Sequence, residues 1–202
     1  MTMTLADLAR PEGVQHLVDV TGGTHSYYNH PERAHEVLAV AQSAIERNPN
    51  IGQTKVRIMP NLPNSFYNFD RGELILGVTN PHALAHELEH ADSLRQASLY
   101  QKLLRVSQGV SRLNNVMALP TMLALRTFLT DKDRRNDILK TLSAVSTAVA
   151  APELMEEASA SIKAIQHSPN RREAMKTLLP AFMAHLTTRL QPALVYQAGR
   201  VP

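Results

Sequence analysis

Apolar and polar positions follow two different periods along the first eighty residues, and each period predicts a different element. From Pro31 to about Arg47 the apolar side chains recur every three or four positions, which predicts an amphipathic helix. Residues 55–59 alternate between polar and apolar, as in a half-buried strand, and residues 74–78 form the continuous apolar run of a buried strand. Residues 64–67, which lie between these two segments in the chain, are expected to form an edge strand. Together the three strands predict a small sheet.

The rest of the chain has the pattern of helices. Asn80 and Pro81 suit the N-cap and first position of a helix that is predicted to reach about Val106, with Gly109 as its stop. Further on, the apolar stretches are residues 116–125 and 138–151, with the charged segment 130–137 between them. They predict a helical hairpin. A further helix is expected to start at Pro152, and a last one to cover about residues 171–190, broken or kinked near Pro180.

Composition sets limits on the class of protein. Of 202 residues, 44% are hydrophobic and 4% aromatic, which suits one globular domain whose core is mainly aliphatic. The net charge of +3 is too mild to indicate nucleic-acid binding without an accompanying motif. Cysteine is absent, which excludes disulfides and thiolate-bound zinc. No secretory signal or 18-residue apolar stretch is found, so the expected location is cytoplasmic or peripheral to a membrane.

The segment His86-Glu87-Leu88-Glu89-His90 has the HExxH pattern of zinc peptidases. Residues i and i+4 share one face of a helix, so His86 and His90 can bind one metal ion. Glu87 directly follows the first ligand, where its carboxylate can take a proton from a zinc-bound water. With nine His and eleven Glu in the chain, the pattern arises by chance in about 2% of such sequences. Apolar neighbours predict a buried helix, in which imidazoles need partners such as a metal.

A hydrolytic zinc site usually has three protein ligands, so a third one is required. Residues 91–166 contain no His, and residues 90–152 contain no Glu. Asp131, Asp133 and Asp137 fall in this interval, but their charged surroundings are better interpreted as a surface turn. The third ligand is therefore expected after Pro152.

Glu157 is the predicted third ligand. On a helix it shares a face with Ala160, Ser161 and Ala164, whose small side chains would allow close approach to the HExxH helix. Ser161 is placed to hydrogen-bond a metal ligand and orient it. Glu153 lies on the same face and is the second candidate.

These elements resemble a known family. The order strand, edge strand, strand, HExxH helix, apolar hairpin and distant Glu helix resembles the gluzincins, and more closely the bacterial neutral zinc metallopeptidase (YugP-like) family related to the HtpX-like peptidases. That family has a helix of the form E-x-x-A-S-x-x-A-L, which residues 157–165 match with Ile165 in place of Leu. Its Ala-rich C-terminal helix is similar to residues 174–185. The resemblance covers about residues 54–190.

Two departures from the family pattern bear on function. The family has HExGH, whereas this chain has Glu89 in place of Gly, and Glu89 is expected to project away from the metal. The family's hairpin usually spans the membrane. Here the corresponding segment is short and diluted by polar residues, which suggests a soluble or peripheral protein with contact to a bilayer interface through residues 116–151.

The expected fold is α+β and zincin-like, with a small mixed sheet followed by a mostly helical part. A single metallopeptidase domain, residues 1–202, is predicted. Its parts are N-terminal helices and a loop (1–50), the sheet (51–80), the HExxH helix (81–108), the apolar hairpin (110–151), and the third-ligand and C-terminal helices (152–195).

The expected function is that of a zinc-dependent endopeptidase with Glu87 as general base, a Zn²⁺ cofactor and a peptide or protein substrate. Residues 64–66 could pair with an extended peptide. The candidates for stabilising the oxyanion are Tyr67, His167, Arg171, Arg172 and His185. The alternatives are an inactive scaffold on the same fold, or a helical protein that associates with membranes or partners. The remaining histidines, His16, His25, His30, His35 and His82, are interpreted as loop or surface residues.

Overall fold

The computed structural model describes residues 2–96 and 98–198, except for the side chains of 94–96, 98, 100–105, 107–108 and 111–115. The fold is α+β, with a four-stranded mixed sheet in the N-terminal part and mostly helices thereafter. The chain forms two compact units. Unit 1 comprises Met1–Ser98 and Ser159–Leu179, and unit 2 comprises Leu99–Ala158 and Pro180–Pro202.

The sheet of unit 1 has the strand order β1-β2-β4-β3. Its strands are β1 (Thr2–Thr4), β2 (Lys55–Ile58), β3 (Phe66–Asn68) and β4 (Glu73–Leu76). Strands β2 and β4 are parallel, while β1 and β3 are antiparallel to their neighbours, which makes the sheet mixed. The predictions of β2, β4 and the edge strand β3 are confirmed. The sequence pattern did not predict β1, because three residues are too few to show a period.

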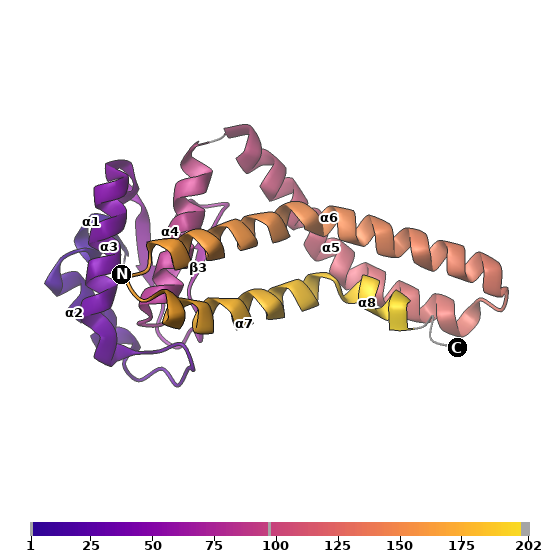
Figure 1. Cartoon of the computed structure of the whole chain (residues 1–202), viewed down its shortest axis with the longest axis horizontal. Helices are drawn as coiled ribbons and strands as arrows, with labels where there is room; N and C mark the ends of the chain where they lie inside the picture. The colour runs from indigo at the N-terminus through magenta and orange to yellow at the C-terminus, as the bar shows by residue number, and fades with distance from the viewer. Residues whose placement is uncertain (1, 97, 199–202) are drawn as a thin grey trace. The chain divides into compact units, whose positions relative to one another are not determined.

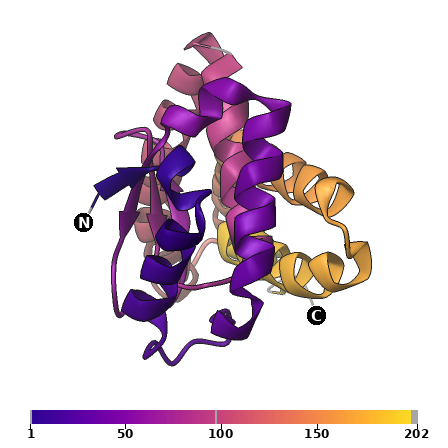
Figure 2. The same cartoon turned by 90° about the vertical axis from the view of Figure 1, so that its left-hand side faces the viewer.

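Unit 1 also contains four complete α-helices. They are α1 (Leu5–Leu8), α2 (Pro11–Thr21), α3 (Ala34–Arg47) and α4 (Pro81–Gln96), and short 3₁₀ turns occupy Pro31–Arg33 and Pro49–Gln53. The predicted amphipathic face of α3 is confirmed, since Val37, Ala41 and Ala44 are all buried. Figure 2 shows α3 and α4 side by side.

Helix α4 begins as predicted. The side-chain oxygen of Asn80 accepts the backbone N–H groups of His82 at 2.9 Å and Ala83 at 3.0 Å, and Pro81 occupies the first turn. Leu84 and Leu88 are at most 2% exposed, so the apolar face of the helix is in the core, as expected.

The predicted end of this helix is wrong. α4 ends at Gln96, and α5 (Ser98–Phe128) continues through the predicted stop at Gly109. A glycine inside a helix costs about 1 kcal/mol relative to alanine, which the many other helical residues of α5 offset.

Unit 2 is mostly helical among its described residues. Its residues come from α5, the first part of α6 (Lys132–His167), the end of α7 (Arg171–Arg189) and α8 (Gln191–Ala198). The last part of α5 and the first part of α6 form the predicted hairpin (Figure 1). Asp131 caps α6 by accepting the N–H groups of Asp133 and Arg134, both at 3.1 Å. The predicted surface turn is thus confirmed for Asp131, whereas Asp133 and Asp137, which are also exposed, lie within α6.

The predicted helix start at Pro152 is also wrong, since Pro152 lies inside α6. Helix α7 runs through Pro180, so the predicted break there is wrong, while the alternative of a kink stays a prediction. Proline removes one hydrogen bond and disturbs one turn, but the remaining turns of a long helix still hold it together.

Among the described residues, no helix has an apolar stretch of the length needed to cross a membrane. Contact of residues 116–151 with a bilayer interface stays a prediction.

Candidate metal centre

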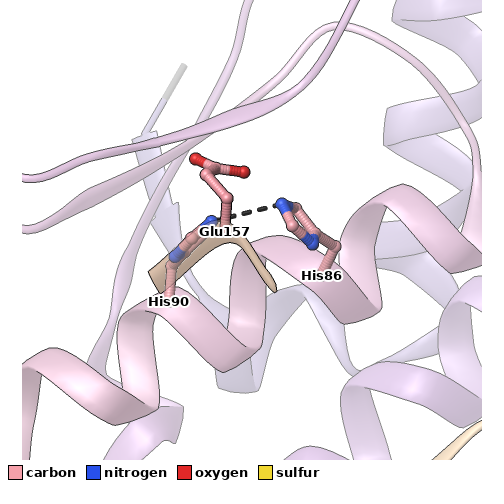
Figure 3. Close-up of side chains that lie close together, drawn as sticks. All are labelled: His86, His90 and Glu157. Atoms are coloured by element: carbon pink, nitrogen blue, oxygen red, sulfur yellow. Dashed lines mark hydrogen bonds between the residues drawn. The ribbon is translucent and has the colours of Figure 1, made fainter. Parts of the chain in front are cut away.

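The structure brings three of the predicted site residues together. One ligand atom from each of His86, His90 and Glu157 lies within 4.8 Å of the others. The two imidazoles come from one face of α4, and the carboxylate of Glu157 reaches the same place from α6 (Figure 3). His90 is only 2% exposed, whereas His86 and Glu157 are half-buried.

The separation of the two imidazoles fits a metal ion. Their Nε2 atoms are 3.2 Å apart. Ligands at zinc–nitrogen distances of 2.0–2.1 Å and tetrahedral angles would be about 3.3 Å from each other. Two imidazoles and one carboxylate are also a donor set that hydrolytic zinc uses. The residues present thus fit a zinc ion in both geometry and chemistry, although the identity of the ion is not fixed by them.

Small residues hold α6 close to α4 near this group. Ala160 and Ala164 are at most 1% exposed, and the Ser161 hydroxyl lies 3.4 Å from Nδ1 of His86. If His86 binds a metal through Nε2, its Nδ1 carries the proton and points it at Ser161, which orients the ring. Glu157 is one turn before Ser161 on the same uninterrupted helix, so the contact of Ser161 also places Glu157.

His90 is held by an aromatic contact. Its ring lies edge-to-face against Phe69 with centroids 5.5 Å apart, and Phe69 in turn lies edge-to-face against Tyr67 at 5.5 Å. Both aromatic residues belong to β3 or to the turn after it, so the edge strand fixes the orientation of a candidate ligand. The sequence carried no signal for this contact.

Glu87 is anchored by the same strand. The backbone N–H of Tyr67 donates to Oε2 of Glu87 at 2.6 Å, and the Glu87 side chain is nearly buried at 9% exposure. Tyr67 was a candidate for stabilising an oxyanion. Its backbone N–H orients the predicted general base, and its role at an oxyanion stays a prediction.

Glu89 points away from the metal-binding group, as expected from its position on the helix. Its buried carboxylate accepts from Nη2 of Arg47 at 3.1 Å, and Oε1 also lies 2.8 Å from Nδ1 of His167. Arg47 is on α3 and His167 ends α6, so one carboxylate ties three helices of unit 1 together. His167, a candidate for the oxyanion, has this structural role here.

Replacing Glu89 by Gln is expected to lower the free energy of unfolding by about 2 kcal/mol, because two charge-assisted hydrogen bonds to a buried group are weakened. Urea denaturation followed by circular dichroism measures this. Glu46→Gln is the control, since Glu46 is an exposed residue of α3, and its change should stay within about 0.5 kcal/mol. Equal stability of Glu89→Gln and the parent would show that the contacts of Glu89 with Arg47 and His167 contribute nothing to the free energy of unfolding.

The second candidate for the third ligand is engaged elsewhere. Glu153 is 4% exposed and lies against Arg189 at 2.5 Å and His185 at 3.5 Å. Burial alone would raise the pKa of Glu153, but the neighbouring His185 and Arg189 lower it, and the net result is below the ordinary value. His185 thus lies beside a buried carboxylate. Arg171 and Arg172 are exposed at the start of α7.

One histidine is placed differently from the sequence interpretation. His82 was taken as a loop or surface residue, which is wrong, since it is 4% exposed within α4. It lies one turn before His86, on a helix that is buried along most of its described length, and this position already favoured burial.

Fold and site define an α+β protein with a candidate His/His/Glu metal-binding group. No family model, curated protein or solved structure matches the chain.

Proposed function

We propose that this protein is a zinc-dependent endopeptidase of the gluzincin type. The observation that carries the proposal is the convergence of His86, His90 and Glu157, with Glu87 directly beside the first of them. A helix-borne pair of histidines, a carboxylate from a second helix and a carboxylate next to the metal ligands are the parts that metal-assisted hydrolysis requires.

Each of these residues has a separate task. A bound zinc ion supplies Lewis-acid polarisation of a carbonyl and lowers the pKa of water near it. His86 and His90 would hold such an ion through Nε2 and Glu157 through its carboxylate, while Ser161 lies 3.4 Å from Nδ1 of His86 and would orient that ring. The Glu87 carboxylate accepts a proton from the attacking water and then donates it to the leaving amine. The Tyr67 N–H keeps Oε2 of Glu87 in place during both transfers.

The substrate proposed is an extended peptide segment laid along β3. This strand is at the edge of the sheet and its backbone contacts Glu87, so a peptide paired with it would lie beside the candidate general base. Phe66 is 42% exposed there and offers an apolar contact.

Metal removal tests the proposal. Purified protein is expected to contain zinc and to cleave an internally quenched peptide mixture, and 1,10-phenanthroline should abolish the cleavage. Adding Zn²⁺ after dialysis should restore it, while Mg²⁺ should not, because imidazole ligands favour zinc over magnesium. Cleavage that persists in metal-free protein would contradict the proposal, and zinc binding without cleavage would support an inactive scaffold instead.

A further inference from the structure

A pocket of about 390 Å³ lies within unit 1, between α3, α4 and residues 167–169 at the end of α6. We refer to it as the α3–α4 pocket. His86, His90 and Glu157 do not line it, so it is separate from the candidate metal centre. Pockets that bind small molecules typically have volumes of about 300–1,000 Å³ and mostly apolar walls with a few polar groups. Helices α3 and α4, which form its two long walls, lie side by side in Figure 2.

The middle of the α3–α4 pocket is apolar. Ala39 and Val40 line it from α3, and Ala85 and Leu88 line it from α4. Ala39 and Val40 follow Glu36 by three and four positions, and Leu88 follows Ala85 by three, so the lining residues of each helix share one face. An aliphatic chain laid between the helices would therefore touch apolar side chains from both.

One end of the pocket offers cationic hydrogen-bond donors. Arg47 lines it and is 40% exposed, so a ligand can reach its guanidinium. Arg47 donates to the hydroxyl of Ser43 at 3.2 Å and to Oε1 of Glu89 at 3.1 Å. A guanidinium has five N–H donors, and these two bonds leave donors for a ligand. His167 lies at the same end, because it shares the Oε1 atom of Glu89 with Arg47.

The opposite end of the pocket is electrically balanced. Glu36 lines it and is ion-paired with Arg33, which also contacts Glu173 at 3.1 Å. Burial, together with the nearby charge of Arg33, keeps the pKa of His82 below its ordinary value, so this imidazole is neutral at pH 7. Arg47 is itself paired with Glu89, but it is the only arginine or lysine among the described residues that line the pocket, so the cationic donors that a ligand can reach are at its end.

The distance between the two ends favours a long ligand. Glu36 and Arg47 are separated along α3 by eleven residues, which corresponds to about 16 Å of helix. A charged head at Arg47 thus leaves room for an apolar chain towards Glu36.

We propose that the α3–α4 pocket binds an aliphatic monocarboxylate, with the carboxylate on Arg47 and the chain between the apolar residues of α3 and α4. Arginine binds carboxylates with paired N–H donors, which gives both strength and orientation. The burial of the aliphatic chain supplies the remaining affinity.

Isothermal titration of the full-length protein with decanoate tests the proposal. Saturable binding with a dissociation constant below about 1 mM is expected. Decan-1-ol and decylammonium have the same chain with a neutral or cationic head, and both should bind at least about tenfold more weakly. Decylammonium binding as tightly as decanoate would overturn the proposal, since the head would then prefer the Glu36 end. Absence of saturable decanoate binding would overturn it as well.

Two arginine variants locate the head group. Arg47→Gln should weaken decanoate binding about tenfold or more, and Arg47→Lys should restore part of it by returning the charge. Arg57→Gln is the matched control, because Arg57 is 39% exposed and paired at 3.0 Å with the buried Glu73, outside the pocket. It should bind decanoate like the parent. Equal loss in Arg47→Gln and Arg57→Gln would contradict binding at Arg47.

A third variant locates the chain. Val40→Trp fills the apolar middle of the pocket from a half-buried position on α3 and should abolish decanoate binding. The parent chain has no tryptophan, so the new fluorescence also reports whether the variant is folded. Undiminished decanoate binding by folded Val40→Trp would overturn the proposal. If Val40→Trp does not fold, the head-group series and the arginine variants still decide it.

Discussion

Glu87→Gln is expected to lower kcat/KM for peptide cleavage by about 10² to 10⁴, the range that a general acid–base group contributes. The substitution keeps the size of the side chain and leaves an amide oxygen to accept the Tyr67 N–H, which donates to Oε2 at 2.6 Å in the parent. The metal ligands are unchanged, so zinc content measured by mass spectrometry should stay that of the parent. The loss should therefore appear in the chemical step and not in metal binding.

A second glutamate of the same motif provides the comparison for Glu87→Gln. Glu89 is also buried on α4, yet its carboxylate contacts Arg47 and His167, away from the metal-binding group. Glu89→Gln should therefore lose stability but retain most of the activity per folded, zinc-loaded molecule. If Glu87→Gln cleaves as fast as the parent, Glu87 is not the general base. If both variants lose activity equally, the loss comes from damage to the fold and does not identify Glu87 as the general base.

Glu157→Gln is expected to weaken zinc binding at least about a hundredfold, because a neutral amide replaces an anionic ligand. Even residues that only orient a ligand change metal affinity by about 10- to 100-fold, so loss of the ligand itself should exceed that range. Competition with a chromophoric chelator measures the affinity. The d–d absorption of cobalt in place of zinc reports whether coordination remains tetrahedral.

The neighbouring residue is a matched control for Glu157→Gln. Glu156 is on the same helix and is 3% exposed, but it is not in the metal-binding group. Glu156→Gln should keep the zinc affinity of the parent, even if it alters stability. Unchanged zinc affinity in Glu157→Gln would show that the third ligand is another group. Glu153 is the alternative predicted from sequence, although Arg189 and His185 engage it in the structure.

The local sequence pattern was sufficient to predict features that depend on residues only a few positions apart. The N-cap Asn80 correctly indicated where α4 starts, and the apolar positions of α3 and α4 correctly indicated which faces they bury. The start predicted for α3 at Pro31 was three residues early, because Pro31–Arg33 form a 3₁₀ turn. The i, i+4 spacing of His86 and His90 likewise placed both imidazoles at one point, because helix geometry alone determines it. The small residues around Ser161 indicated a close helix contact, which the structure shows.

Predicted helix boundaries were less reliable. Gly109, Pro152 and Pro180 all lie inside helices, although each residue type disfavours a helix interior. A low helix propensity costs up to a few kcal/mol at one position. In a long helix the hydrogen bonds and packing of many turns contribute more than this to stability. A single unfavourable residue therefore does not specify an end.

By itself, the sequence determined the helix that carries His86, Glu87 and His90, and it restricted the third ligand to the acidic residues after Pro152. Only the tertiary structure decided that Glu157 reaches the two imidazoles while Glu153 pairs with Arg189. It also decided that Tyr67 orients Glu87, and that Glu89 joins Arg47 to His167 beside a pocket. The physical reason is that helical periodicity relates residues within one element, whereas contacts between elements depend on how their buried faces pack.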